Sequence, residues 1–280
     1  MPRNCLSREE IIAALRTALE NDPDVLAAWL GGSDATGRTD EYSDIDLQII
    51  VDDEKVEATF ERLHETLERL SPIAHCHRFP EPTWHGHSQE LLQLRDADPN
   101  HFLDLVIMRR SIPDRLLERE RHGKPLVLID RANLLQAPPL DWPAHLKKME
   151  HRFAEMRSRF PLLQPLVTRG IHHRHLAESA YAYQVLTLKP LIDLLRLRHC
   201  PERFDFGPRY LDRDLPHEWR IEIERLAYPP SPEALLEFQT TAARHFGEQI
   251  AAFDQGEWQL RRPRGPGDQR KSSTRTRSLE

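Results

Sequence analysis

The pattern of apolar and polar positions divides the chain into a first part that mixes strands with helices and a second part that is helical. Ser7 and Glu10 have the spacing of a capping box, and apolar residues then recur at helical intervals as far as Leu19. This pattern predicts a first helix, an amphipathic helix over 54–70 and a short helix over 113–121. Short or alternating apolar runs predict six strands: 25–30, 45–51, 73–79, 91–94, 102–108 and 126–129.

A proline-rich stretch without periodicity, residues 136–143, follows the last predicted strand and marks the expected domain boundary. Helices are predicted beyond it over 144–160, 170–198, 215–227 and 232–255. Pro190 is expected to kink or divide the second of these helices because proline has no N–H to donate. The predicted fold class is α+β, with a mixed β-sheet flanked by helices followed by a C-terminal helical bundle.

One stretch between the first two predicted strands carries the strongest chemical signal. Gly31, Gly32 and Ser33 form a turn whose exposed N–H groups and hydroxyl can bind phosphate oxygens. Asp44 and Asp46 lie two residues apart at the start of the next strand, so their side chains should point to the same face. Two adjacent carboxylates repel each other, and a divalent cation with oxygen ligands, such as Mg²⁺, keeps both ionised. A metal site beside a phosphate site is suited to transfer of a nucleotidyl group.

Leu30-Gly31-Gly32, an eleven-residue spacer and then Asp44-Ile45-Asp46-Leu47 resemble the signature of the nucleotidyltransferase superfamily typified by DNA polymerase beta. Within that superfamily, the short spacer and small companion domain are most similar to the antibiotic nucleotidyltransferases of the aminoglycoside type. The resemblance implies a nucleotidyltransferase catalytic domain over 1–135 and a helical acceptor or lid domain over 143–258.

The same resemblance implies which residues act. Asp44 and Asp46 would be catalytic metal ligands, and a third acid is expected on a later strand. Asp104 is the best candidate because it is a charge inside an apolar run, although it would be solvent-exposed if that strand lay at the edge of the sheet. It would serve as metal ligand, general base or both. Arg38 and Lys189 are candidates for contacts to nucleotide phosphates, beside Gly31, Gly32 and Ser33.

The implied reaction is transfer of a nucleoside monophosphate, AMP from ATP or the equivalent group from another nucleoside triphosphate, to a hydroxyl of a small molecule. It would use Mg²⁺ or Mn²⁺ and release pyrophosphate. An aminoglycoside-type antibiotic is one acceptor class, which makes antibiotic resistance one hypothesis for the role. Two alternatives stay open: transfer to a protein or RNA end, as in toxin–antitoxin nucleotidyltransferases, and a catalytically silent sensor that only binds nucleotide.

The composition of the chain limits the kinds of partner and the cellular location that we expect for the protein. Residues 1–142 hold 16 Lys and Arg against 27 Asp and Glu, so there is no basic stripe for a nucleic-acid polymer. No apolar run reaches the about 20 residues of a membrane helix, and the N-terminus has no signal-peptide pattern. Three separated cysteines indicate reduced thiols and a cytoplasmic protein. Residues 261–280 are basic and lack an apolar pattern, which predicts a disordered tail.

The fifteen histidines raise the question of a second metal site. His75, His77, His85 and His87 form two His-x-His pairs, a spacing that binds zinc where a fold brings such pairs together. Neither a Cys-x-x-Cys nor a His-Glu-x-x-His motif accompanies them, so the sequence argues against a zinc site at these histidines. The sequence does not specify the acceptor, the nucleotide base or the oligomeric state.

Overall fold

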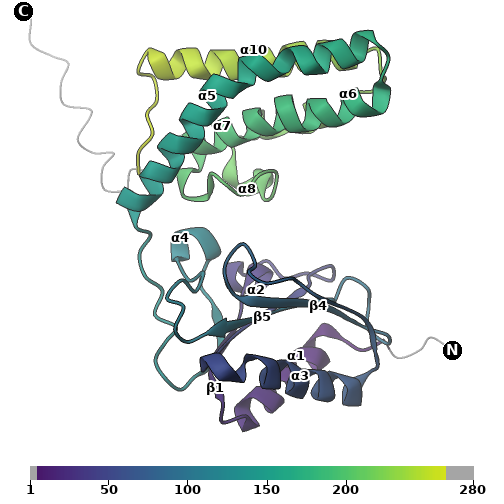
Figure 1. Ribbon diagram of the computed structural model, residues 1–280, viewed down its shortest axis with the longest axis vertical. Helices are drawn as coiled ribbons and strands as arrows, with labels where there is room; N and C mark the ends of the chain where they lie inside the picture. Colours follow the sequence, from purple (N-terminus) through teal and green to yellow (C-terminus); the bar gives the residue numbers. More distant parts are fainter. Residues whose placement is uncertain (1–4, 263–280) are drawn as a thin grey trace, which may run out of the picture. The chain divides into compact units, whose positions relative to one another are not determined.

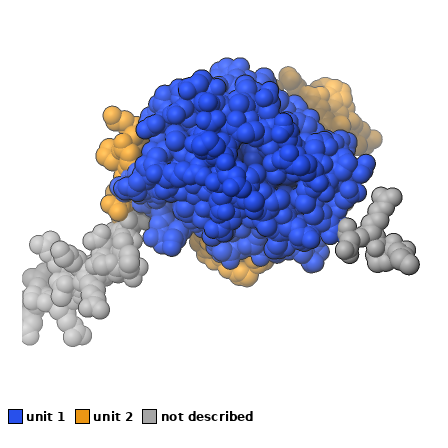
Figure 2. Space-filling view, turned by 90° about the horizontal axis from the view of Figure 1, so that it is seen from below, with its two compact units in different colours: residues 1–140 blue, residues 141–280 orange. Residues whose placement is uncertain are grey.

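The computed structural model describes residues 5–262, and the chain forms two compact units that meet in sequence between Leu140 and Asp141 (Figure 1; Figure 2). Among the described residues, the first unit contains all the strands, and the second contains helices and connecting loops. The α+β class predicted from the apolar pattern is confirmed. Within residues 5–262, no helix is both long and apolar enough to cross a bilayer.

The N-terminal unit is built on one six-stranded mixed sheet with strand order β3-β4-β5-β2-β1-β6. Strands β2 and β5 pair in parallel, and the other four neighbouring pairs are antiparallel. The predicted strands agree closely with the observed bounds, which are β1 Val25–Leu30, β2 Ile45–Val51, β3 Ile73–Arg78, β4 Ser88–Leu94, β5 Leu103–Arg109 and β6 Leu126–Asp130.

Two helices, α1 (Arg8–Asn21) and α3 (Val56–Leu70), lie side by side on one face of this sheet (Figure 1). Both reciprocal bonds of the predicted capping box, between Ser7 and Glu10, are present at the start of α1. The apolar side chains of both helices pack against alternate strand residues such as Leu47 and Leu105, which are fully buried. This helix-covered face fixes the register of the strands, since a slip by one residue would turn the apolar set outward.

The opposite face of the sheet has an apolar end and a polar end. At the apolar end, Trp29 and Met108 pack beneath Leu117 and Leu135, which belong to the connection that follows β5 and the segment that follows β6. The polar end carries Asp46 and neighbouring polar residues, and the short helix α2 (Gly32–Thr36) lies on this side of the sheet (Figure 1).

The C-terminal unit packs its helices around one apolar cluster that includes Phe153, Leu194 and Phe246. Its elements are α5 Trp142–His172, α6 Leu176–Tyr183, a π-helical turn Gln184–Leu188, α7 Lys189–His199, a 3-10 turn Pro201–Arg203, α8 Leu211–Asp214, α9 His217–Ala227 and α10 Leu235–Asp254.

The largest difference from the sequence prediction concerns α5, which was expected to end near residue 160 but runs on to His172 through Pro161 and Pro165. Each of these prolines removes one helical hydrogen bond. Buried apolar residues continue along α5 on both sides of them, including Phe160 and Val167. Tertiary packing therefore stabilises the helix across positions that propensity alone would break.

The predicted helix over 170–198 is interrupted at residues 173–175 and again by the π-helical turn. Pro190 lies in the first turn of α7, directly after the π-helical turn, so the helical run divides just before this proline, in agreement with the expected kink or division. Proline cannot donate to the carbonyl four residues earlier, that of Leu186. The side-chain amide of Gln164 donates to this carbonyl instead, at 2.9 Å. The freed acceptor is thus satisfied from a neighbouring helix.

Two further differences concern the short helix expected over 113–121 and the basic tail expected over 261–280. The helix expected over 113–121 is reduced to α4 (Arg119–His122), because residues 113–118 adopt an irregular path that inserts Leu117 into the sheet's apolar end. Most of the basic tail expected over 261–280 lies outside the described residues, since the description ends at 262. The structure describes a short helix, Asp53–Lys55, just before α3.

Candidate active site

Two aspartates lie side by side on the polar end of the sheet. Parallel pairing of β2 with β5 sets Asp46 directly opposite Asp104. Residues in register on neighbouring strands point to the same face, so both carboxylates project away from the helix-covered core. β5 lies between β4 and β2, so Asp104 is on an inner strand, and the edge-strand alternative considered for it does not apply.

Asp44, the third aspartate, directly precedes β2 and is held in place through its main chain. The guanidinium of Arg8, at the start of α1, donates to the Asp44 carbonyl from Nε at 3.1 Å and from a terminal nitrogen at 3.0 Å. Arg8 also forms a buried ion pair with Asp34 on α2. One arginine therefore connects α1, α2 and the start of β2, and it brings a single positive charge to a cluster of acids.

The glycines between β1 and α2 approach the aspartates closely. The Gly31 N–H donates to the Asp46 carbonyl at 2.9 Å, and α2 then begins at Gly32. Gly32 has φ of +47°, and a Cβ at this position would lie 1.7 Å from Oδ2 of Asp46. Both the backbone conformation and the available space therefore require glycine. The Ser33 hydroxyl is buried and has no hydrogen-bond partner within residues 5–262, so it is available to a ligand.

The three aspartates of the site all have raised pKa values, as expected for clustered carboxylates without a bound cation. Burial, followed by the charges of Asp44, Asp104 and Asp34, raises the pKa of Asp46 to about 7. Burial also raises the pKa of Asp44 and of Asp104. Such shifts mean that ionising the cluster without compensating positive charge is unfavourable. Oxygen-only donors are what Mg²⁺ and Mn²⁺ prefer, so these residues fit the divalent ion implied by the sequence.

The structure adds two residues to the site that sequence reasoning missed. The amide of Gln89 on β4 donates to both carboxylate oxygens of Asp104, at 2.8 and 3.0 Å. His85 lies 3.1 Å from the Gln89 amide oxygen through its Nε2. Gln89 was detectable only as a polar position in an alternating strand. Its pairing with Asp104 depends on the register of β4 against β5, which the sequence does not reveal.

The two remaining predicted site residues, Arg38 and Lys189, form contacts within their own units. Arg38 follows α2 in the spacer loop, and its main-chain N–H donates to the Ser33 carbonyl at 3.0 Å. Lys189 belongs to the C-terminal unit and is 2.6 Å from a carboxylate oxygen of Asp193. Their assignment to nucleotide phosphates stays a prediction.

The zinc site considered for the four histidines is not formed. His75 and His77 project from β3, whereas His85 and the buried His87 belong to the β3–β4 connection. Within residues 5–262, no three of these histidines bring ring nitrogens within 4.8 Å of one another. His87 instead contacts the Asp114 carbonyl at 2.7 Å. The direction of the β3 histidines is set by the pairing of β3 with β4, which is a feature of the tertiary structure.

Comparison with known protein families supports the chemistry of the site. Residues 13–131 match the family model described as Polymerase beta, Nucleotidyltransferase. This span includes all six strands, the Gly-Gly-Ser segment and the three aspartates. The N-terminal unit is a nucleotidyltransferase domain. The protein is accordingly a nucleotidyltransferase enzyme with a nucleotide substrate. No curated protein matches the chain. The resemblance to the aminoglycoside group stays a prediction.

The close approach of Gly32 to Asp46 yields a first prediction. Gly32→Ala should displace the Asp46 carboxylate and abolish metal-dependent nucleotide binding, because the added methyl group would overlap Oδ2. Gly37→Ala is the matched control, since Gly37 has φ of +65° but open space around its Cβ position. That variant should lose about 1–2 kcal/mol of stability from backbone strain alone and still bind nucleotide. Calorimetric titration of both variants tests this, and unimpaired binding by Gly32→Ala would contradict it.

The raised pKa of Asp46 yields a second prediction. In the unfolded chain this carboxyl ionises near pH 4, whereas in the folded protein its pKa is about 7. Between these values the folded state keeps a proton that the unfolded state has lost, so metal-free stability should fall as the pH rises from about 4 to about 7. Asp46→Asn should remove this part of the pH dependence, so its melting temperature should exceed that of the wild type most clearly above pH 7.

Melting curves in the presence of a chelator measure this difference. Glu61→Gln, which neutralises an exposed carboxylate on α3, should follow the wild-type curve. Adding Mg²⁺ above pH 7 should stabilise the wild type more than Asp46→Asn. Identical pH profiles for the wild type and Asp46→Asn would show that Asp46 has no raised pKa.

Proposed function

We propose that this enzyme transfers a nucleoside monophosphate, AMP from ATP in the first instance, to a hydroxyl group of a small molecule and releases pyrophosphate. The observation that carries the proposal is the placement of Asp46 and Asp104 in register beside the start of α2. The proposed phosphate-binding residues and the carboxylate pair would therefore act together at one end of the sheet.

The N-terminal unit offers separate groups for the triphosphate and for the cation. Gly32 and Ser33 would bind the β- and γ-phosphates through main-chain N–H groups and the Ser33 hydroxyl, which has no hydrogen-bond partner in the part of the chain that the structure describes. Asp44 and Asp46, with Asp104 as a third ligand, would hold Mg²⁺ or Mn²⁺. When bound, the ion supplies positive charge that offsets the negative charge developing on the α-phosphate and the pyrophosphate. Arg38 is a further candidate for a phosphate contact.

Asp104 is also placed to accept a proton. Burial raises its pKa, which makes the carboxylate a better base than an exposed aspartate, and Gln89 fixes its orientation. In the proposed step the acceptor hydroxyl gives its proton to Asp104 while its oxygen forms a bond to the α-phosphorus. The bond from the α-phosphorus to the bridging oxygen breaks, and pyrophosphate leaves with that electron pair.

The charge of the N-terminal half bears on the nature of the acceptor. The N-terminal half has an excess of acidic residues, 27 against 16 basic ones, which favours a cationic small molecule such as an aminoglycoside over a nucleic acid. The role of residues 143–258 as acceptor or lid domain, and the contact of Lys189 with phosphate, stay predictions. Transfer to a protein or RNA end is the alternative that an acceptor panel would distinguish.

Nucleotide binding is the first test of this function. Mg²⁺ or Mn²⁺ together with a nucleoside triphosphate should raise the melting temperature, because a ligand that binds only the folded state stabilises it by mass action. The four triphosphates should be compared, with Gly32→Ala as the control that cannot bind. Pyrophosphate release with a panel of hydroxyl acceptors then identifies the reaction. A melting temperature unchanged by millimolar metal and all four triphosphates would overturn the proposal.

The role of Asp104 gives a separate prediction. Asp104→Asn keeps the shape of the side chain but removes the base, so transfer should fall by about 10²–10⁴. Nucleotide binding should be near normal because Asp44, Asp46 and the start of α2 are unchanged. Calorimetric titration of nucleotide together with a turnover assay separates a role as general base from a role as metal ligand. Asn100→Asp, at an exposed position before β5, is the control for a change of charge nearby. Loss of both binding and turnover would identify Asp104 chiefly as a metal ligand, and normal turnover would remove it from the site.

A further inference from the structure

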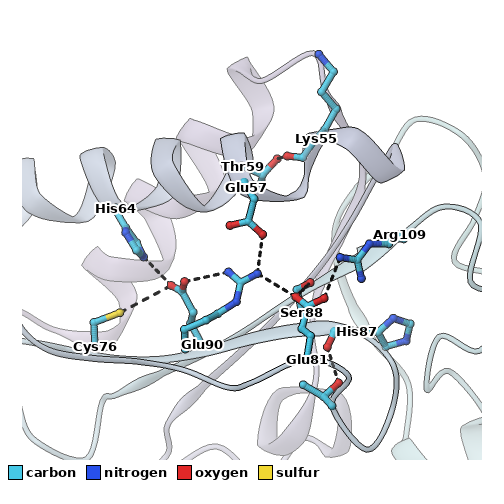
Figure 3. Close-up of polar contacts among 12 residues, drawn as sticks. Lys55, Glu57, Thr59, His64, Cys76, Glu81, His87, Ser88, Glu90 and Arg109 are labelled. Carbon is cyan, nitrogen blue, oxygen red and sulfur yellow. Dashed lines mark hydrogen bonds and ion pairs between the residues drawn. The ribbon is translucent and has the colours of Figure 1, made fainter.

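A second group of potential metal ligands lies on the opposite, helix-covered face of the sheet, near the edge formed by β3 and β4. His64 on α3, Cys76 on β3 and Glu90 on β4 each contribute one possible ligand atom, and these atoms lie within 4.8 Å of one another. Nε2 of His64 is 2.6 Å from Oε2 of Glu90, and Sγ of Cys76 is 3.9 Å from the same oxygen (Figure 3).

Strand alternation explains why these side chains meet. Cys76 pairs with Leu92, and paired residues on antiparallel strands point to the same face. Glu90 lies two residues from Leu92 on β4 and therefore shares that face. Gln89, its neighbour, points to the other face and contacts Asp104. The two sites are thus separated by the thickness of the sheet.

The two carboxylate oxygens of Glu90 have different surroundings. Oε2 faces both His64 and Cys76, whereas Oε1 accepts a hydrogen bond from Arg78 at 3.0 Å. Arg78 is itself fixed by Glu57 and Glu81, at 2.9 and 3.2 Å. Its guanidinium also lies over the Phe60 ring, 3.9 Å from the centroid. Metal-binding carboxylates commonly have such an outer partner, which orients the ligand and leaves one oxygen for the metal.

We propose that His64, Cys76 and Glu90 bind a zinc-class divalent metal ion through Nε2, Sγ and Oε2, with a fourth coordination position open to solvent. Imidazole nitrogen, thiolate sulfur and carboxylate oxygen are the three donors that tetrahedral Zn²⁺ sites use. The active-site aspartates offer oxygen alone, so the two sites select different metals: Mg²⁺ or Mn²⁺ there, and Zn²⁺ or Co²⁺ here.

Metal binding requires a defined exchange of protons. The Cys76 S–H bond breaks, its proton goes to solvent, and the thiolate donates an electron pair to the metal. His64 must be neutral, with the Nε2 lone pair directed at the metal in place of its contact with Glu90. Because the thiol must lose this proton before it can bind the metal, affinity should increase as the pH rises.

The ligands come from three elements, so a bound ion would tie α3 to the β3–β4 edge of the sheet. β3 is an edge strand whose side chains are largely exposed, and within residues 5–262 β4 is the one strand that pairs with it. Edge strands are held by fewer contacts than inner strands, so a link to α3 would stabilise β3 against local unfolding. The binding should therefore raise the melting temperature without any nucleotide.

Cobalt provides a readout that the active site cannot mimic. Titration of the full chain with Co²⁺ at pH 8 should produce a near-ultraviolet thiolate-to-cobalt charge-transfer band that saturates at one equivalent and disappears on addition of Zn²⁺. Carboxylates give no such band, so binding to Asp44, Asp46 and Asp104 does not contribute. Cys76→Ser should abolish the band, whereas Cys5→Ser should keep it because Cys5 is an exposed cysteine outside the cluster.

Two more variants separate ligand loss from misfolding. His64→Gln alters a partly exposed helix position and should weaken Co²⁺ affinity at least tenfold. Glu57→Gln removes a carboxylate that pairs with Arg78 and is not itself a ligand, so it should change the affinity far less. Circular dichroism establishes that each variant is folded. Absence of the band in the wild type would overturn the proposal. So would a band that survives in folded Cys76→Ser, or cobalt affinity unchanged by His64→Gln.

Discussion

Parallel pairing of β2 with β5 places the carboxylates of Asp46 and Asp104 next to each other. When both are ionised these carboxylates repel each other, and the residues around them must offset this repulsion. Asp44 adds a third negative charge, and Arg8 supplies a buried positive charge that holds the main chain of Asp44 and the side chain of Asp34. Burial, followed by the acidic charges that Arg8 offsets only in part, raises the pKa of Asp46 to about 7. Energy stored as unfavourable ionisation in the free protein favours cation binding, because the cation removes the repulsion.

Alternation along the strands lets one sheet carry two kinds of polar chemistry. Gln89 and Glu90 are neighbours on β4, yet one orients Asp104 and the other lies beneath α3 with His64 and Cys76. The apolar cluster on the helix-covered face keeps the strands in register, and register in turn decides which polar residues meet. A one-residue slip of β4 would exchange the surroundings of Gln89 and Glu90 and disrupt both groups.

The C-terminal unit shows how packing overrides local preference. Pro161 and Pro165 lie inside α5, and the buried side chains of Phe160 and Val167 hold that helix on either side of them. Gln164, between these prolines, satisfies the carbonyl of Leu186 that Pro190 leaves unpaired. A single polar side chain thus links α5 to the π-helical turn before α7, where Pro190 leaves a carbonyl without its helical donor.

The sequence by itself determined the strands, the first helix and the Gly-Gly-Ser and Asp-x-Asp elements, because apolar periodicity, capping and turn chemistry are local properties. It also indicated Asp104, since a charge in an apolar strand is unusual wherever the strand lies. Only the tertiary structure decided that Asp104 is in register with Asp46 and that Gln89 and Arg8 support the aspartates. It also decided that His64, Cys76 and Glu90 come together, whereas the His-x-His pairs do not. These outcomes depend on which strands pair and in what register. Pairing is set by the burial of the whole apolar face, so no short stretch of sequence specifies it.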